Sequence, residues 1–441
     1  MNKNLLYIFL AITLMASSCR KDDDYVFDRS SDERLNETLG NYQKALSSSQ
    51  YGWNGNLTTG DGGTYRFYFS FNDSNRVVMF SDFDSTTATV LRESSYRLKA
   101  LQQPSLIFDT YSYLHILSDP DAAVNNGTYG QGLKGDFEFR VDTVTADSIS
   151  LTGRFNGSRL SLRKAAQFDR TVWVNKQVTN GVVKFKDYWK FLSYFKRLNY
   201  AGTQYELQFD TTLKKVTVSW MVGSQAQTVT RGYYFWANGV YFTDPIVNGA
   251  ATIPGFSINS FDMGAQVMSV GVNAAAATIT SATAPINPDV KNAVNRWWSR
   301  GATSDNFWVS YTGFHINGVD DAYNIRSLRN DTAKFEFLLY KNNTDGADAF
   351  FTIYSDTADN SFAVVSGSWV NMTVTASSGR ARFNELEVRA NSPWPAGPAD
   401  NTRQQLYNPA GYYFVQSSDR TFDMVSIADP KIWISWIWEF D

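Results

Sequence analysis

The chain has 441 residues, which is enough for about three domains and a large buried core. Its 40 basic and 43 acidic residues leave a net charge of -3, so its electrostatics give no reason to expect nucleic acid as a partner. The single cysteine, Cys19, excludes disulfides within the chain, and stability must therefore come from burial of the core.

Residues 1–18 predict a signal peptide that is removed. Lys3 precedes the apolar stretch from Leu5 to Met15, which is shorter than the roughly 20 residues that a membrane-spanning helix needs. Small residues, Ala16 to Ser18, then come directly before Cys19, as lipoprotein processing requires. We expect the mature chain to begin at Cys19 with acyl chains attached, because each buried methylene adds roughly 0.8 kcal/mol to such an anchor. An ordinary secretory signal with an incidental cysteine is the alternative.

Residues 19–29 predict a flexible, lipidated tether, since the segment from Arg20 to Asp24 is charged and packs poorly. This segment resembles the acidic export tag of Bacteroidota lipoproteins that are sent to the outside of the outer membrane. That resemblance implies an outer-membrane location in which the lipid holds the chain facing the cell exterior.

Residues 30–170 predict a first unit made of a helix and an antiparallel meander. Ser30 and Glu33 form a capping box, and apolar residues recur at helical spacing from Leu35 to Leu46. The alternation from Tyr65 to Phe71 is typical of a strand. Further strands are expected at residues 76–80, 95–99, 105–116, 137–141, 148–154 and 159–163.

The same order of elements recurs in residues 171–285 and 286–441, either as true structural repetition or by chance in an aromatic-rich chain. The second unit has an apolar helical stripe from Phe185 to Phe195, and the segment from Ala274 to Pro285 is expected to be a linker or a weak edge strand. The third unit begins with a helix after Asn287. Strands are expected at residues 205–209, 215–221, 307–311, 335–340, 350–354, 362–365, 372–375 and 432–440.

Few catalytic schemes are open to this composition. The two histidines, His115 and His315, are far apart, and no His-Glu-x-x-His motif or cysteine pair offers zinc ligands. There is no Gly-x-Ser-x-Gly elbow, Walker loop or dinucleotide-binding glycine pattern. We therefore expect no cofactor, no metal and no assigned catalytic residue, and carboxylates are the remaining chemistry, because glycoside hydrolysis needs only two of them.

One polar constellation stands out as a candidate binding patch in the first unit. Asp109, Tyr111 and His115 alternate onto one face of the strand expected at 105–116, and Asp136 and Glu138 alternate opposite phenylalanines on another strand. If the two strands share a sheet, these groups line one surface. A solvated sheet face is the structural alternative.

Two loop segments offer weaker candidates. Trp394 lies in the rigid sequence Pro393 to Pro398, where its indole is either a platform for a sugar ring or a plug between sheets. The segment Asn342 to Asp348 carries oxygen ligands and a glycine, but it lacks the spacing of an EF-hand, and a hairpin turn is the simpler interpretation.

Several segments of the first unit together resemble domain-of-unknown-function family 4302, a family of Bacteroidota lipoproteins of about this length. The resemblance is most specific from residue 19 to about residue 165. It implies a surface lipoprotein that often neighbours nutrient-uptake receptors, and it supplies no known activity. The segments are Phe27-Asp28, Glu33-Arg34, Gly52-Trp53, Ser95 to Leu98, Pro104 to Tyr111, Leu114-His115, Asp119-Pro120 and Gly135 to Phe139.

The sequence therefore predicts a mainly β (α+β) protein of antiparallel sheets or meanders with a few amphipathic helices, in two to three units. Its aromatic content of 15% suits strand-rich cores and sugar-stacking surfaces. We expect a non-enzymatic binding or accessory lipoprotein that captures a polymer, either glycan or peptide, beside outer-membrane uptake proteins. A carboxylate-based hydrolase and a structural partner in an outer-membrane complex are the alternatives.

Overall fold

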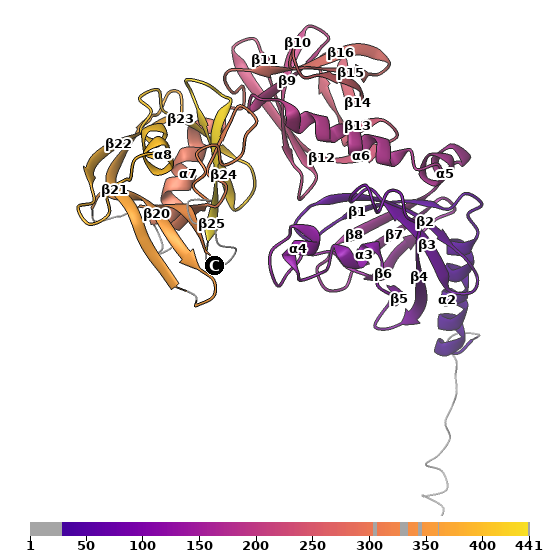
Figure 1. Cartoon of the computed structure of the whole chain (residues 1–441). Helices are drawn as coiled ribbons and strands as arrows, with labels where there is room; N and C mark the ends of the chain where they lie inside the picture. The colour runs from indigo at the N-terminus through magenta and orange to yellow at the C-terminus, as the bar shows by residue number, and fades with distance from the viewer. Residues whose placement is uncertain (1–28, 303–306, 327–333, 343–345, 360, 440–441) are drawn as a thin grey trace, which may run out of the picture.

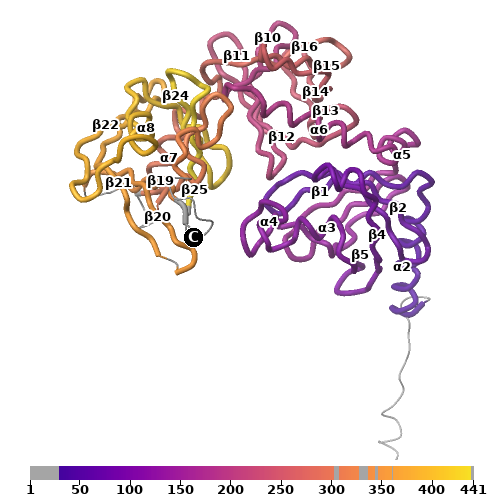
Figure 2. The backbone as a smooth tube through the Cα atoms, viewed as in Figure 1, coloured from indigo at the N-terminus to yellow at the C-terminus, as the bar shows by residue number. Residues whose placement is uncertain are grey.

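A computed structural model describes residues 29–302, 307–326, 334–342, 346–359 and 361–439. The predicted signal peptide and Cys19 lie outside these residues. Three antiparallel sheets follow one another along the chain, and the second lies between the other two (Figures 1 and 2). The predicted fold class, mainly β with accessory helices, is confirmed. No helix in the described part of the chain is long and apolar enough to cross a membrane.

The first sheet is a closed eight-stranded barrel in which β1 pairs with both β2 and β8. Its first helix begins with the predicted capping box, in which Ser30 and Glu33 bond each other's backbone N–H. The elements of this unit are α2 (Ser31–Ser47), β1 (Trp53–Thr58), β2 (Thr64–Phe71), β3 (Arg76–Ser81), β4 (Arg92–Ala100), β5 (Pro104–Phe108), α3 (Tyr113–Ile116), α4 (Ala122–Asn125), β6 (Glu138–Val144), β7 (Ser148–Gly153) and β8 (Arg159–Lys164).

Strand β2 shows how alternation builds this barrel. Phe67 and Phe69 are fully buried in the core of the first barrel, where their rings stack 5.4 Å apart. Tyr68 points the opposite way and packs on Trp173 of the next unit. Successive side chains of a strand point to opposite faces, so β2 contributes to two cores at once.

The second sheet is also a closed eight-stranded barrel, and β9 closes it by pairing with both β10 and β16. The elements of this unit are α5 (Gln167–Val174), α6 (Val178–Phe185), the 3-10 helix η1 (Lys186–Lys190), β9 (Phe195–Tyr200), β10 (Thr203–Asp210), β11 (Lys215–Val222), β12 (Gln225–Trp236), β13 (Gly239–Asn248), β14 (Ala251–Asp262), β15 (Val267–Val272) and β16 (Ala275–Ala282).

Three sequence-based expectations are wrong in their extent. The strand expected at residues 105–116 ends at Phe108, and a short helix, α3, takes its second half. The apolar stripe from Phe185 to Phe195 is not one helix, because α6 ends at Phe185 and Phe195 already belongs to β9. The segment after Ala274 is neither linker nor edge, since β16 is paired on both sides.

The third sheet has nine strands, and β17 and β25, its first and last strands along the chain, also pair with each other. Helix α7 supplies Trp297, which is fully buried against the rings of Tyr340 and Phe414 at centroid distances of 4.4 and 4.8 Å. The elements are α7 (Val290–Ala302), β17 (Phe307–Ser310), β18 (Phe314–Ile316), β19 (Lys334–Lys341), β20 (Asp348–Asp356), β21 (Ser361–Thr375), β22 (Arg380–Val388), α8 (Pro398–Leu406), β23 (Tyr412–Gln416), β24 (Thr421–Ser426) and β25 (Ile432–Glu439).

A buried ion pair joins the first barrel to the second. Lys214 Nζ lies 2.8 Å from Asp82 Oδ1, and the two side chains are only 3% and 0% exposed. Asp82 also accepts hydrogen bonds from the backbone N–H of Arg66 at 2.8 Å and of Phe235 at 2.9 Å. Arg66 belongs to the first barrel and Phe235 to the second, so one carboxylate ties together backbone from both sheets.

Candidate functional site

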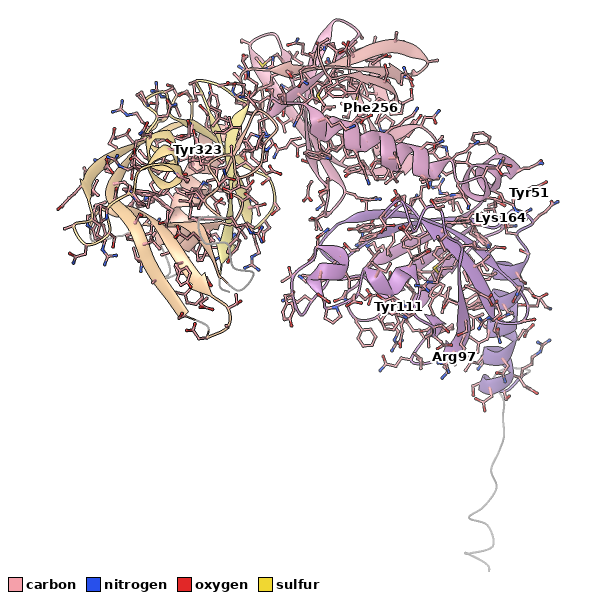
Figure 3. The ribbon with its side chains drawn as sticks, viewed as in Figure 1. Tyr51, Arg97, Tyr111, Lys164, Phe256 and Tyr323 are labelled. Carbon is pink, nitrogen blue, oxygen red and sulfur yellow. The ribbon has the colours of Figure 1, made fainter. Side chains whose placement is uncertain are left out.

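The structure divides the predicted patch of the first barrel. Asp109 lies beyond the end of β5 and forms an ion pair with Arg97 on the outer surface. Tyr111 is 46% exposed, and its hydroxyl donates to Asp119 Oδ2 at 2.8 Å (Figure 3). Glu138, at the start of β6, is half-buried opposite Ile107. These side chains share one region of the barrel, but they do not alternate on a single strand.

His115 is held by its own helix. Its Nδ1 accepts a hydrogen bond from the backbone N–H of Ser112 at 3.0 Å. Its ring stacks on Phe137 at 4.3 Å and on Tyr111 at 5.5 Å. Burial lowers the pKa of His115, and the charge of Asp109 partly opposes that shift. A neutral, stacked imidazole with this bonding is a structural histidine.

Asp136 does not face a surface. Its side chain is 2% exposed, and its oxygens accept four hydrogen bonds from the turn between β7 and β8. The donors are the N–H groups of Phe155, Asn156 and Ser158 and the hydroxyl of Ser158. A carboxylate bonded in this way fixes a turn, so the expectation that Asp136 lines a binding surface with Glu138 is replaced by a structural role.

Trp394 fills space in a core and does not present an exposed indole face to a sugar. It is only 9% exposed and belongs to the core of the third sheet. Its indole N–H donates to Ser368 Oγ at 2.7 Å. The segment Asn342 to Asp348 lies partly outside the described residues, and within them Asp348 accepts a hydrogen bond from Tyr340 at 2.6 Å. Among the described residues, no group of three His, Cys, Asp or Glu side chains is arranged to hold a metal ion.

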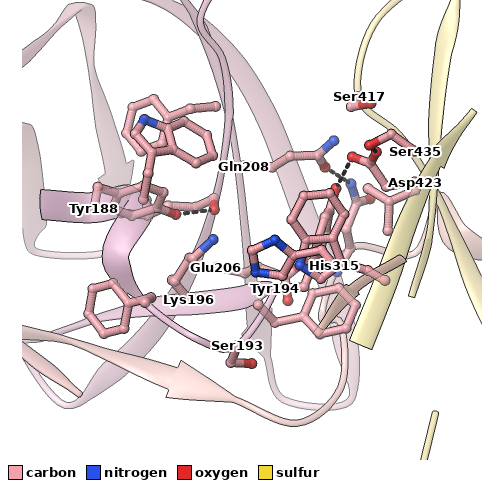
Figure 4. Close-up of a pocket in the computed structure, with 18 of the residues that line it drawn as sticks. Tyr188, Ser193, Tyr194, Lys196, Glu206, Gln208, His315, Ser417, Asp423 and Ser435 are labelled. Carbon is pink, nitrogen blue, oxygen red and sulfur yellow. Dashed lines mark hydrogen bonds between the residues drawn. The ribbon is translucent and has the colours of Figure 1, made fainter. Parts of the chain in front are cut away.

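A cavity with an aromatic wall lies elsewhere, between the second barrel and the third sheet (Figure 4). Its volume is about 370 Å³. Aromatic side chains form much of its wall, among them Tyr188, Phe191, Tyr194, Phe209 and Trp433. We call this space the junction cavity.

The pairing of two strands of the second barrel ends beside the junction cavity. Strands β9 and β10 are paired only as far as Arg197 and Glu206, so Lys196 and Leu207 are not ladder partners. The cavity is lined by Leu207 and also by its neighbours Glu206 and Gln208. Because successive side chains point to opposite faces of a strand, residues from both faces of β10 line the cavity where this pairing ends.

Lys196 is the buried lysine that lines the junction cavity. It is 8% exposed, and its Nζ lies 5.1, 5.3 and 5.7 Å from the ring centroids of Tyr188, Trp189 and Tyr194. Burial lowers the pKa of Lys196 to about 8, and the charge of Asp423 opposes this shift from across the cavity. The ammonium is therefore still mainly protonated at neutral pH.

Two buried carboxylates line the same cavity and are already bonded. Glu206 accepts hydrogen bonds from the backbone N–H of Ile286 at 2.6 Å and of Asn287 at 3.3 Å. Asp423 accepts from the hydroxyl of Tyr194 at 2.6 Å and from that of Ser435. Burial raises the pKa of each carboxyl, and these hydrogen bonds oppose the shift.

The second histidine of the chain borders the junction cavity. His315 stacks on Trp433 with ring centroids 4.4 Å apart. Its Nδ1 lies 2.6 Å from Asp320 Oδ1, an exposed carboxylate. The imidazole is thus fixed at both its face and its edge, and it closes one side of the aromatic wall.

Sequence reasoning missed this site. The wall joins residues as distant as Tyr194 and Asp423, which are separated by 229 positions. One local signal was present, because Glu206 and Gln208 alternate with Tyr205, Leu207 and Phe209 on a strand whose second face is then buried.

The fold and this site define a β-rich protein of three ring-like sheets, with an aromatic-walled, charge-bearing cavity where the second and third meet. The chain belongs to the family described as Domain of unknown function (DUF4302), whose profile matches residues 23–260. The match spans the first barrel and runs into β14 of the second. The family resemblance drawn from the first unit is thereby confirmed.

Comparison with curated proteins gives no match. Among solved structures, the chain is similar to a β sliding clamp of C. crescentus with 11% identity, covering 92% of this chain and 96% of that one, at a TM-score of 0.17. It is also similar to a DUF3598-family protein of unknown function from Nostoc punctiforme with 9% identity, covering 73% and 96%, at a TM-score of 0.14. Scores of this size support no inference about fold or function.

Proposed function

We propose that this protein is a non-enzymatic, lipid-anchored binding protein of the bacterial outer membrane, and that the junction cavity holds its ligand. The observation that carries the proposal is the cavity itself, whose volume of about 370 Å³ falls in the range of roughly 300–1,000 Å³ typical of small-ligand sites. Such a space accepts one unit or one end of a glycan or peptide. The protein would therefore bind a polymer by its terminal unit.

The chemistry of the wall supports binding rather than turnover. Both carboxylates in the cavity have their oxygens bonded to fixed donors, as described above. In the first barrel, Asp136 likewise accepts hydrogen bonds from four donor groups, which argues against a role for it in the carboxylate pair of the hydrolase alternative. Aromatic rings with a few convergent polar groups are the usual composition of a ligand pocket.

The anchor part of the proposal depends on the sequence before residue 29. Small residues precede Cys19, and an acidic tether follows it. A multiply acylated cysteine holds a folded body at a membrane surface, beside uptake proteins that receive the ligand. Replacement of Cys19 by serine is expected to move the protein from the membrane fraction to the soluble fraction, and mass spectrometry of the native N-terminal peptide should show acyl chains on Cys19. An unmodified Cys19 would contradict the anchor.

The binding part is tested by screening the acyl-free body against glycan and peptide arrays, with variants in two places. Trp433→Ala removes part of the cavity wall and is expected to weaken binding by about tenfold, in keeping with the energy of an aromatic contact. Thr421→Trp fills the cavity without removing the wall. Tyr111→Ala is the matched control, because Tyr111 is an exposed aromatic residue of the first barrel.

Three outcomes separate the alternatives. Binding that both cavity variants reduce and Tyr111→Ala preserves supports the proposal. Binding that only Tyr111→Ala reduces would move the site to the first barrel. If no ligand binds and the protein co-purifies in fixed ratio with an uptake receptor, the structural-partner alternative holds instead.

A further inference from the structure

We infer that the junction cavity selects a sugar ring that carries a carboxylate, as in a uronic acid unit, and that Lys196 binds this carboxylate. The inference deepens the proposed function and rests on it. It names the chemical class of the ligand and the side chain that recognises it.

The first argument is the missing counter-charge of Lys196. In the described part of the chain, its ammonium has no carboxylate at ion-pair distance, and its neighbours are aromatic rings. Asp423 acts on it only through the longer-range field. The other fully buried lysine described, Lys214, is paired directly with Asp82 at 2.8 Å. A buried charge is costly unless it is paired, so a cavity that keeps one unpaired is prepared for an incoming anion.

The second argument limits the charge of that anion. Lys196 is the only lysine or arginine among the described residues that line the cavity. Glu206 and Asp423 line the same space and would repel a dianion more strongly than a monoanion. Phosphate and sulfate sites commonly use several cationic groups or backbone N–H clusters. A singly charged carboxylate matches one ammonium.

The third argument concerns the rest of the ligand. The polar residues Ser193, Ser417, Thr421 and Asn287 are part of the cavity lining. These residues suit a ligand with several hydroxyls, whereas the aromatic side chains of Tyr194 and Trp433 add apolar lining for the C–H side of a sugar. A peptide C-terminus brings the carboxylate but few hydroxyls, so the lining favours the sugar.

The test compares charged and neutral forms of one ligand. Trigalacturonate and triglucuronate are titrated into the folded acyl-free body at pH 7 by calorimetry, beside the fully methyl-esterified trigalacturonate, in which the ring is unchanged and the charge is gone. We expect at least one free acid to bind, and its ester to bind at least about tenfold more weakly, since a hydrogen bond to a charged group is worth that much.

Two variants assign the effect to Lys196. Lys196→Met is expected to lower the affinity for the free acid at least about tenfold and to leave that for the ester unchanged. Lys190→Met is the matched control, because Lys190 lies on η1 near the cavity but is exposed and paired with Asp187. Thermal unfolding of each variant confirms that it folds.

Each other outcome overturns the inference in a recognisable way. Equal binding of acid and ester, or binding that Lys196→Met does not change, shows a neutral-sugar site and leaves the proposed function standing. Binding of tripeptide C-termini in a Lys196-dependent manner, with no uronate bound, makes the site a peptide site. If Trp433→Ala and Thr421→Trp also affect no ligand of any array, the cavity is not a binding site, and both proposals fail.

Discussion

At the scale of single residues, Lys196 has a measurable energetic signature. Its pKa is lowered to about 8 in the folded chain, against 10.5 for an unperturbed lysine. Below pH 8 the folded protein must hold a charge that the unfolded chain solvates better, so Lys196 destabilises the fold there. Between about pH 8 and 10.5 the unfolded chain binds the extra proton, and the penalty disappears as pH rises.

We therefore predict that Lys196→Met raises the free energy of unfolding at pH 7 by a few kcal/mol, and that this gain shrinks toward zero by about pH 10.5. The measurement is urea unfolding of both proteins across this pH range. The titratable groups that share the cavity with Lys196 are Tyr188, Tyr194, Glu206, Asp423 and His315. Burial raises the pKa of Asp423 and the charge of Lys196 opposes this rise, so the loss of this coupling is part of the measured difference from wild type. A variant that is less stable than wild type at pH 7 would mean that Lys196 has a structural partner.

Asp136 gives a second prediction at this scale. Asp136→Asn keeps the shape of the side chain but replaces one accepting oxygen by an NH₂ group. This group then faces hydrogen-bond donors in the turn that follows β7. We expect a loss of about 3 kcal/mol of stability, because hydrogen bonds to a buried carboxylate are lost and donors stay unsatisfied. Asp109→Asn is the control, since the exposed pair with Arg97 is worth at most about 1 kcal/mol. Equal effects of the two changes, measured by chemical unfolding, would contradict this account.

At the scale of elements, strands with regular alternation of apolar and polar residues could be predicted from the sequence, and strands without it could not. Strand β2 was predicted because every second residue from Tyr65 to Phe71 is aromatic. Strand β1 was not, since Asn54, Gly55 and Asn56 have low strand propensity. The ring of Phe69 lies 2.6 Å from where a Cβ of Gly55 would stand, so packing requires glycine in this strand.

The same logic explains β16 and α6. Strand β16 is built of Ala, Thr and Ser, which carry little hydrophobic signal, and its existence depends on the need to close the barrel between β15 and β9. Helix α6 was predicted too late along the chain, because the aromatic residues of η1 and the start of β9 continue its apolar spacing. Tertiary closure, which no local window contains, decided both elements.

Helix α7 carries an element-scale prediction. Trp297 meets Trp308, Tyr340, Phe414 and Trp436 in the centre of the third sheet. Trp297→Ala is expected to cost about 3–5 kcal/mol, because it leaves a large cavity among rigid rings. Trp189→Ala is the control, as Trp189 is 49% exposed. Near-ultraviolet circular dichroism and urea unfolding report the effect, and a cost below that of the control would show that α7 is not the centre of this core.

At the scale of the whole molecule, the ion pair of Lys214 and Asp82 is the key contact between the first two barrels. Lys214→Met leaves Asp82 as an unpaired buried charge, and we expect a loss of about 3–5 kcal/mol. Adding Asp82→Asn to the same chain should recover part of this loss, since the orphaned charge is then removed. Unfolding of the single and double variants measures it, and a double variant no better than the single one would argue against the pair.

The candidate site forms only where the second barrel packs against the third sheet, which is why no single segment of the sequence indicates it. Lys196, Glu206 and Asp423 lie in two different sheets, and each looks like an ordinary strand residue in its own segment. These three residues line the same cavity only because the third sheet packs against the second barrel. In contrast, the patch proposed in the first barrel used residues close together in sequence, and one break in strand geometry after Phe108 was enough to divide it.

The walls of the junction cavity come from two separate sheets. Binding of a ligand in the cavity would therefore stabilise the contact between these sheets. A ligand present at 100 times its dissociation constant would add roughly 2.7 kcal/mol to the contact between the two bodies. Conversely, traction that draws the third sheet away from the second would open the wall of the cavity. With the proposed anchor at Cys19, such traction would be a mechanical means of releasing the proposed ligand.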